Sequence, residues 1–144
     1  MIKFTVLGIP QAQGRPRAGK TRTGKTVLYD PAKSRDYKQY VRLVASQHAP
    51  RNPIEHPVSV FIDVYRQIPS SMSKKRRRLA NAKIYRPITK SDIDNYSKSI
   101  LDSLNGILWK DDAQVVSLTA NKYYSDEPRI EVAVQILEEG RDKD

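Results

Sequence analysis

Four aspartates lie close together in a chain that is otherwise strongly basic. Asp92 and Asp94 are separated by one residue, and Asp111 and Asp112 follow after the length of a short helix. Clustered carboxylates repel one another unless a cation neutralises them, and Mg²⁺ commonly bridges carboxylates and substrate phosphates. Side chains two apart in an extended segment point to the same side, so the first pair is expected to share one ion or one pocket. The pattern predicts a divalent metal site and phosphodiester chemistry.

A lysine lies between two carboxylates on a helix expected over residues 94–105. Lys98 is four residues after Asp94, and Asp102 is four residues after Lys98, so the three side chains share one helical face. A lysine in this position would stabilise the charge that develops on a scissile phosphate. Gly106 is suited to end the helix, and a return loop would bring the second aspartate pair back to the first.

Each of these residues also has a purely structural explanation. Asp94 could cap a helix, Asp102 could pair with Lys98, and the second aspartate pair could be an exposed turn. All of them together at this spacing are harder to explain in that way, so a catalytic site is favoured.

The charge of the chain is distributed unevenly. The 144 residues carry a net charge of +10, with 20 basic and 4 acidic side chains in residues 1–90 and 6 basic and 12 acidic ones in residues 91–144. Because a basic surface attracts polyanions, the first part is expected to be a phosphate-binding surface, while the second holds the acidic cluster. The alternative is a solvated basic surface with an acidic tail.

Two basic segments and one further lysine are the candidate DNA contacts. The glycine-rich stretch 11–26 lacks the spacing of a phosphate-binding P-loop and is expected to be a basic loop or irregular hairpin. The run 74–78 is the second segment, and either segment could be merely solvated. The candidate residues are Arg15, Arg17, Lys20, Arg22, Lys25, Lys74, Lys75, Arg76, Arg77, Arg78 and Lys90.

The residue types that are rare or absent exclude several kinds of site. Without cysteine the chain has no disulfide, thiolate zinc site or cysteine nucleophile, and its two histidines are too few for a histidine-rich metal site. No signal peptide or membrane-spanning run is recognisable, so we expect a cytoplasmic protein without a membrane partner.

The remaining periodicities predict a single α+β domain over residues 1–144. Alternating apolar residues indicate strands at 2–8, 58–64, 115–124 and 130–136, and the last two are expected to form an antiparallel hairpin. Asp30–Pro31 is suited to begin a helix that runs to about His48. We expect a two-layer fold in which a mixed or antiparallel sheet packs against two main helices, with residues 138–144 frayed.

Three stretches of the sequence resemble the RusA-type Holliday junction resolvases. They are Asp92–Lys98 (DIDNYSK), Leu101–Gly106 (LDSLNG) and Asp111–Val115 (DDAQV). The resemblance is clear over about residues 90–118 and looser over the flanking strands, basic loop and helix. It implies a small α+β endonuclease that works as a homodimer, needs Mg²⁺ with Mn²⁺ as a substitute, and makes paired nicks in four-way DNA junctions. Members of the family are often bacterial or phage-borne.

The resemblance also implies roles for individual residues. The essential carboxylates of the family correspond to Asp92, Asp94 and Asp112, and its essential lysine corresponds to Lys98. Asp111 would be a further metal ligand of secondary importance, and Asp102 and Asn95 would support the site.

Paired nicks need two active sites, and a two-fold homodimer would supply them for a nearly two-fold symmetric junction. The sequence does not identify the interface, which an apolar face of the 58–64 strand or of the predicted hairpin could supply. Two alternatives stay open: an endonuclease with a broader preference for branched DNA such as flaps and forks, and a catalytically silent protein that binds junctions. The complete carboxylate and lysine set disfavours the silent protein, because binding DNA needs no carboxylate cluster.

Overall fold

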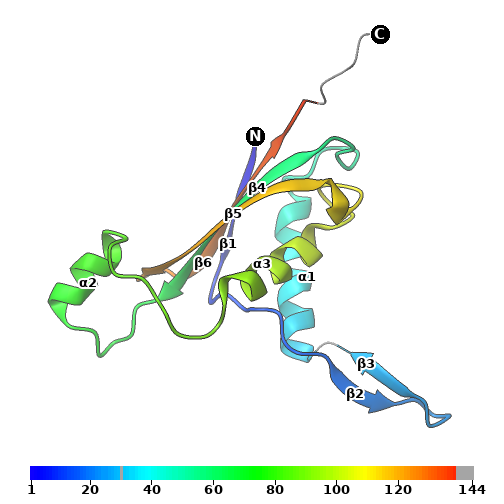
Figure 1. Ribbon diagram of the computed structural model, residues 1–144, viewed down its shortest axis with the longest axis horizontal. Coiled ribbons are helices and arrows are strands. Elements are labelled where there is room, and N and C mark those ends of the chain that lie inside the picture. Colours follow the sequence, from blue (N-terminus) through cyan, green and yellow to red (C-terminus); the bar gives the residue numbers. More distant parts are fainter. Residues whose placement is uncertain (30, 139–144) are drawn as a thin grey trace.

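A computed structural model describes residues 1–29 and 31–138. Along the chain it contains β1 (Ile2–Leu7), β2 (Arg17–Lys20), β3 (Thr26–Tyr29), α1 (Ala32–Ser46), β4 (Val58–Gln67), α2 (Lys74–Asn81), α3 (Ile93–Leu104), a 3₁₀ turn (Asp112–Gln114), β5 (Val115–Ser125) and β6 (Arg129–Ile136). Four strands form a mixed sheet, and β2 pairs with β3 in a separate hairpin. The α+β class predicted from the sequence is confirmed (Figure 1).

β4 lies inside the four-stranded sheet, whose order is β1–β6–β4–β5. It pairs antiparallel with β6 and parallel with β5. Its alternating residues Val58, Val60, Ile62 and Val64 point to one face of the sheet, where all four are fully buried. β4 is therefore paired on both edges and contributes a continuous row of buried side chains to the core.

α1 and α3 cover this apolar face and lie beside each other (Figure 1). α1 buries Tyr37, Val41 and Ala45, which recur at helical spacing, and α3 buries Ile100 and Leu104. These residues join one apolar core with the strand side chains. α3 also contacts β5, so its polar face is left at the surface beside that edge strand.

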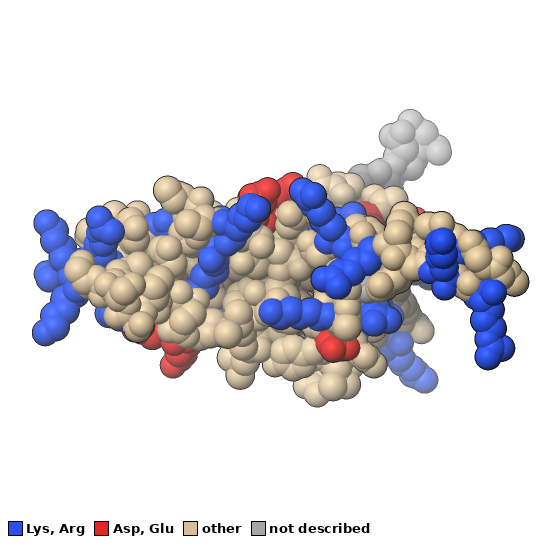
Figure 2. Space-filling model, turned by 90° about the horizontal axis from the view of Figure 1, so that it is seen from below, with Lys and Arg blue, Asp and Glu red and all other residues tan. Residues whose placement is uncertain are grey.

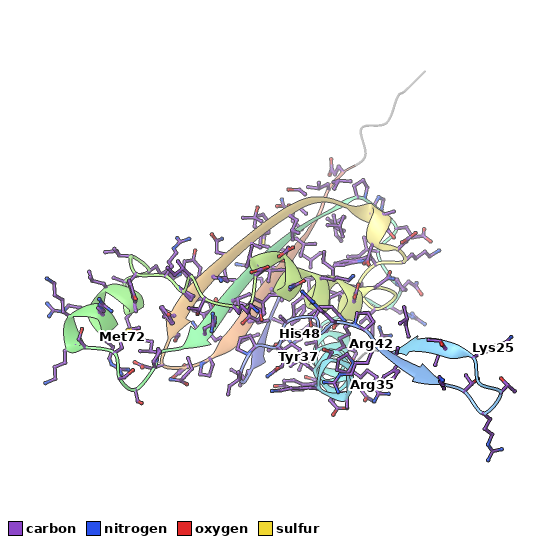
Figure 3. All side chains as sticks on the ribbon, turned by 60° about the horizontal axis from the view of Figure 1, so that its bottom comes forward. Lys25, Arg35, Tyr37, Arg42, His48 and Met72 are labelled. Atoms are coloured by element: carbon purple, nitrogen blue, oxygen red, sulfur yellow. The ribbon has the colours of Figure 1, made fainter. Side chains whose placement is uncertain are left out.

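α2 and the β2–β3 hairpin project at opposite ends of the molecule (Figure 1). In Figure 3, Lys25 marks the hairpin end and Met72, which precedes α2, marks the other end. Ser73 caps α2, because its hydroxyl accepts a hydrogen bond from the Arg76 N–H at 3.2 Å. In the described residues, no helix is long and apolar enough to cross a membrane.

The strand pairing differs from the expectation in one important respect. β5 and β6 do not form a hairpin, because β4 lies between them and pairs with both. The apolar face of β4 is covered by the two helices, so it is not available as a dimer interface. Of the two surfaces that the sequence suggested for a dimer, the β4 face is covered by the helices and the β5–β6 hairpin does not form, whereas Val116 and Leu118 of the edge strand β5 stay exposed.

Smaller differences concern the helices and the ends of the chain. The run 74–78 forms most of α2, a helix that the periodicities did not predict, and Ala80 gives that helix a buried contact. Residue Pro31 occupies the N-cap position of α1. Asp30, expected to cap that helix, lies outside the described residues, as does the part of the expected frayed tail over residues 139–144.

The opposite face of the sheet has a hollow of about 350 Å³ near its centre. Its lining includes Phe61 and Asp63 of β4, together with Lys3 and Thr5 of β1 and Glu131 of β6. This face therefore mixes charged, polar and aromatic side chains, in contrast to the apolar face beneath the helices.

Candidate active site

An open pocket lies between the polar face of α3, the 3₁₀ turn and β5. Its volume is about 370 Å³, and Leu101, Leu118 and Ala120 contribute apolar walls. The pocket is also lined by four residues singled out from the sequence, Asp94, Lys98, Asp102 and Asp112. The structure therefore brings one residue of the second aspartate pair to the α3 face that carries the first.

Lys98 lies on α3 between Asp94 and Asp102, and its side chain is exposed. Asp102 pairs with Lys38 of α1, with the Lys38 Nζ and Asp102 Oδ2 atoms 3.4 Å apart. Asp102 is therefore tied to the neighbouring helix and is not simply the ion-pair partner of Lys98. Within residues 1–29 and 31–138, no ion pair or hydrogen bond engages the Lys98 ammonium, so its three donors are available to a phosphate.

A hydrogen bond from a buried indole orients Asp112. Trp109 Nε1 donates to Asp112 Oδ1 at 2.9 Å, and the Trp109 side chain is fully buried. The turn after α3 sets up this contact, because Gly106 has φ of +80° and its N–H donates to the Trp109 carbonyl at 2.8 Å. Glycine adopts this φ without strain, so the residue that ends α3 also helps to position Asp112.

Asp111 has a different environment from its neighbour. Its Oδ1 accepts a hydrogen bond from the Ala113 N–H at 3.3 Å, and its own N–H donates to Gln114 Oε1 at 2.9 Å, which together form a capping box. Gln114 Nε2 also donates to the Ile54 carbonyl at 2.7 Å, fixing the turn to the rest of the fold. Asp111 does not line the pocket, so its carboxylate serves the turn.

Asp92 and Asp94 are not two side chains of one extended segment, and that expectation is wrong. Asp92 is the N-cap residue of α3, whereas Asp94 lies in the first helical turn. Asp92 is exposed, does not line the pocket and makes no capping hydrogen bond, so the helix does not use its carboxylate. Asn95 is also exposed, and its carbonyl accepts from the Gln13 N–H at 3.1 Å, which ties the start of the basic stretch to α3.

The donors in the pocket fit a divalent cation that shares its coordination with substrate. Asp94 and Asp112 line the same space, and Mg²⁺ commonly takes one or two carboxylates while water and phosphate oxygens fill its other positions. In the part of the chain that the structure describes, no three histidine or acidic residues are grouped so as to hold an ion by themselves. Such a site would depend on substrate oxygens to complete it.

Basic side chains gather at both ends of the molecule and across the face seen in Figure 2. Most of the candidate DNA contacts are exposed, namely Arg15, Arg17, Lys20, Arg22, Lys25, Lys74, Lys75, Arg76, Arg78 and Lys90. Arg77 is half-buried, because it donates to Asp126 Oδ1 at 2.8 Å and to the Pro69 carbonyl at 3.3 Å. Arg77 therefore fastens α2 to the turn between β5 and β6, whereas its neighbours face solvent.

Two cations that the sequence analysis missed fix the approach to the pocket. Arg66 donates to the Thr89 carbonyl at 2.9 Å, and Lys122 donates to the Thr89 and Ser91 carbonyls at 3.1 and 3.0 Å. These bonds hold the segment that leads from α2 to α3. Their partners are distant in sequence, so no local pattern marks these two cations. Trp109 was also missed, and the signal nearest to it is that the only tryptophan of the chain precedes the second aspartate pair.

The fold and the pocket together have the features of a small nuclease, with carboxylates and a lysine in an open site between basic ends. A family model described as endodeoxyribonuclease RusA matches residues 8–135. This match covers nearly the whole chain, so the protein belongs to the RusA endodeoxyribonuclease family, and the resemblance inferred from the sequence is confirmed. The chain is also similar to YqaN of Bacillus subtilis (strain 168), described as an uncharacterized protein, with 54% identity over 136 residues that cover 93% of this chain and 95% of that protein.

Proposed function

We propose that this protein is a divalent-metal-dependent endonuclease that resolves Holliday junctions by paired, symmetric nicks in DNA recombination and repair. The observation that carries the proposal is that Lys98, without an ion pair in the described residues, shares one pocket with Asp94 and Asp112. Membership of the RusA family supports DNA as the substrate and strand cleavage as the reaction.

The proposed reaction is hydrolysis of one phosphodiester in each pocket. The carboxylates of Asp94 and Asp112 would hold Mg²⁺ or Mn²⁺ in the pocket. The family resemblance adds Asp92, which lies at the start of α3 and outside the pocket lining. When bound, such an ion orients water and polarises a phosphoryl oxygen. Lys98 donates to an oxygen of the scissile phosphate and stabilises the charge that this oxygen gains in the transition state.

Asp102 has a supporting role in this proposal. Its ion pair with Lys38 links α3 to α1 at the pocket wall and holds the Asp102 carboxylate in place. Asp111 maintains the turn that presents Asp112. These two residues position the site, whereas Asp92, Asp94, Asp112 and Lys98 act on metal and substrate.

The basic ends of the molecule allow DNA to approach an acidic pocket. An uncompensated carboxylate cluster repels phosphates, so the charge around it has to be reversed by cations of the protein and by the metal. The exposed lysines and arginines of α2 and of the β2–β3 hairpin lie at opposite ends of the molecule, with α3 between them (Figures 1 and 2). This arrangement suits a substrate whose arms extend to both sides of the scissile phosphate.

The protein is proposed to act as a homodimer, because a junction is cut on two opposing strands and each chain supplies one candidate active site. The proposed contact is the mixed polar and aromatic sheet face around Phe61 and Asp63, which the helices do not cover. Light scattering on the purified protein is expected to give twice the 16.5 kDa mass of the chain. A monomer that still makes both nicks would contradict this part of the proposal.

The function is tested by cleavage of labelled four-way, three-way, flap and linear DNAs of matched length, each with Mg²⁺ and with a chelator. We expect paired nicks at symmetric positions in the four-way junction only, and loss of cleavage with the chelator. Asp94→Asn is the matched inactive control, because it removes one charge while keeping the size of the side chain.

Two alternatives correspond to other outcomes of this experiment. Equal cutting of flaps, forks and four-way junctions would indicate an endonuclease with broader branched-DNA specificity. Tight junction binding without cleavage in either Mg²⁺ or Mn²⁺ would indicate a silent junction-binding protein, and would contradict the proposed function.

A further inference from the structure

Two tyrosines form a partly exposed stack beside α2. The rings of Tyr85 and Tyr124 have centroids 5.8 Å apart and planes inclined by 18°. Tyr85 as a whole residue is 36% exposed, and Arg76 Cζ lies 5.7 Å from the centroid of its ring. The aromatic surface of this pair is therefore accessible from solvent and is accompanied by a cation.

The stack lines one side of an open hollow of about 490 Å³. The opposite side comes from the segment before α2, including Pro69, Ser71 and Met72. The hollow thus combines aromatic and apolar surface with hydroxyl groups and a guanidinium. A nucleobase has the same combination of requirements, since it presents a flat π-face, polar edges and a nearby phosphate.

Other contacts already attach the segment that follows α2 to the sheet. Tyr65 and Tyr123 are both buried and pack with ring centroids 5.3 Å apart. Lys83 lies over both rings, with Nζ 5.5 Å from the Tyr65 centroid and 4.7 Å from the Tyr123 centroid, and Arg86 lies over Tyr123 at 4.6 Å. The exposed tyrosine stack is therefore not the main attachment of the segment.

We propose that the hollow beside Tyr85 and Tyr124 binds an unpaired base of the DNA substrate by stacking. The inference rests on the function proposed above and deepens it, because it names a feature of the substrate outside the scissile phosphate. Stacking on tyrosine tolerates any base, since every base has a π-face. Arg76 lies near the outer limit of a cation–π contact with Tyr85, so this contact holds it only weakly. In the proposed complex its exposed guanidinium binds the phosphate of the stacked nucleotide.

The hollow is connected to the active-site pocket by a fixed segment. Tyr85 lies at one end of this segment and Asp92 at the other, and Thr89 between them is held by Arg66 and Lys122. A strand whose base occupies the hollow is thereby guided toward the start of α3. A continuous duplex has no unpaired base to place there, so the hollow favours branched DNA.

The test compares binding of two labelled single strands by fluorescence anisotropy, without metal. One strand is oligothymidylate, and the other has the same number of phosphates but carries abasic residues throughout. The parent protein is expected to bind the oligothymidylate about 5- to 150-fold more tightly for one stacked base. Tyr85→Ala is expected to remove this difference, whereas Tyr85→Phe is expected to keep it. Tyr40→Ala is the control, because Tyr40 on α1 is 40% exposed and lies outside the hollow.

Each other outcome overturns the inference. Equal binding of both strands by the parent protein would mean that the hollow binds no base. An equal loss of affinity for both strands in Tyr85→Ala would mean that the stack only supports α2. If the alanine variant does not fold, as judged by the fluorescence of Trp109 and thermal unfolding, Tyr85→Leu replaces it and the same outcomes apply. The binding assay needs no cleavage, so the two proposals can fail separately. A protein that cuts junctions but binds both strands equally would overturn this inference alone. A protein that prefers the oligothymidylate but does not cut junctions would overturn the proposed function alone.

Discussion

The indole N–H of Trp109 donates a hydrogen bond of 2.9 Å to the carboxylate of Asp112. Trp109 is fully buried and Asp112 lines an open pocket. The hydrogen bond therefore fixes one carboxylate oxygen of the pocket to a side chain of the core. A carboxylate held in one orientation binds an ion in one geometry, and the outer-sphere partners of metal ligands commonly act in this way.

Replacing Trp109 with Phe is expected to lower junction cleavage about 10- to 100-fold, because the Asp112 carboxylate loses its fixed orientation. The lost hydrogen bond and volume are also expected to lower the free energy of unfolding by about 1–3 kcal/mol. Cleavage rates measured well below the melting temperature separate the two effects. Leu108→Ala is the control, since Leu108 is equally buried and contributes no polar group. An equal loss of cleavage in both variants would contradict a specific role for the indole.

Lys98→Ala is expected to slow cleavage about 100- to 1,000-fold, because a preorganised donor to the transition state is lost. Junction affinity, measured by anisotropy in Ca²⁺ or without metal, is expected to change much less. Lys110→Ala is the matched control, since Lys110 is exposed and pairs with Glu55 outside the pocket. Unaltered cleavage by the Lys98 variant would remove this lysine from the site.

The two adjacent aspartates are expected to respond differently to the same substitution. Asp112→Asn is expected to lower cleavage by at least about 100-fold, because a metal ligand is weakened, while junction binding is kept or improved as local negative charge falls. Asp111→Asn is expected to retain most activity and stability, since asparagine caps a helical turn about as well as aspartate. Cleavage assays and urea unfolding of both variants check the assignment, and a reversed order of effects would exchange the two roles.

Removing charge from α2 is expected to weaken binding through phosphates rather than through sequence. For Lys74→Gln combined with Lys75→Gln, the slope of log affinity against log salt is expected to fall by up to about 1.8, or about 0.9 for each phosphate that the protein no longer neutralises. Arg51→Gln, an exposed change in the connection between α1 and β4, is the control. An unchanged slope in the α2 variant would mean that these lysines are only solvated.

Alkaline pH is expected to destabilise the fold through Tyr37. Burial raises the pKa of Tyr37 above its ordinary value of 10.0, and the nearby Tyr40 adds to this shift. Because the folded state favours the neutral phenol, its contribution is intact below pH 10 and is lost progressively as the pH rises above that value. Urea unfolding between pH 8 and pH 11 is therefore expected to show a steeper loss of stability in the parent than in Tyr37→Phe. Parallel pH curves would contradict this assignment.

Local spacing in the sequence predicted most of the individual elements and one face of the site. The separation of Asp94, Lys98 and Asp102 by four residues places them together on any α-helix, because the helical repeat is fixed by the backbone. The apolar alternation of β4 and the glycine after α3 are similarly local signals. The exact start of α3 was less predictable, since the backbone changes from extended to helical between Asp92 and Asp94.

Tertiary structure decided which distant residues meet. The sequence predicted a hairpin of the last two strands, but β4 lies between them, where both of its edges are paired and its apolar face is buried. This pairing places β5, and with it Asp112, beside α3. The contacts of Trp109 with Asp112 and of Lys38 with Asp102 likewise follow from packing. The sequence by itself determined the chemical groups and their local spacing, whereas the packing of separate elements selected the carboxylates that share the pocket, because such contacts depend on residues that are far apart along the chain.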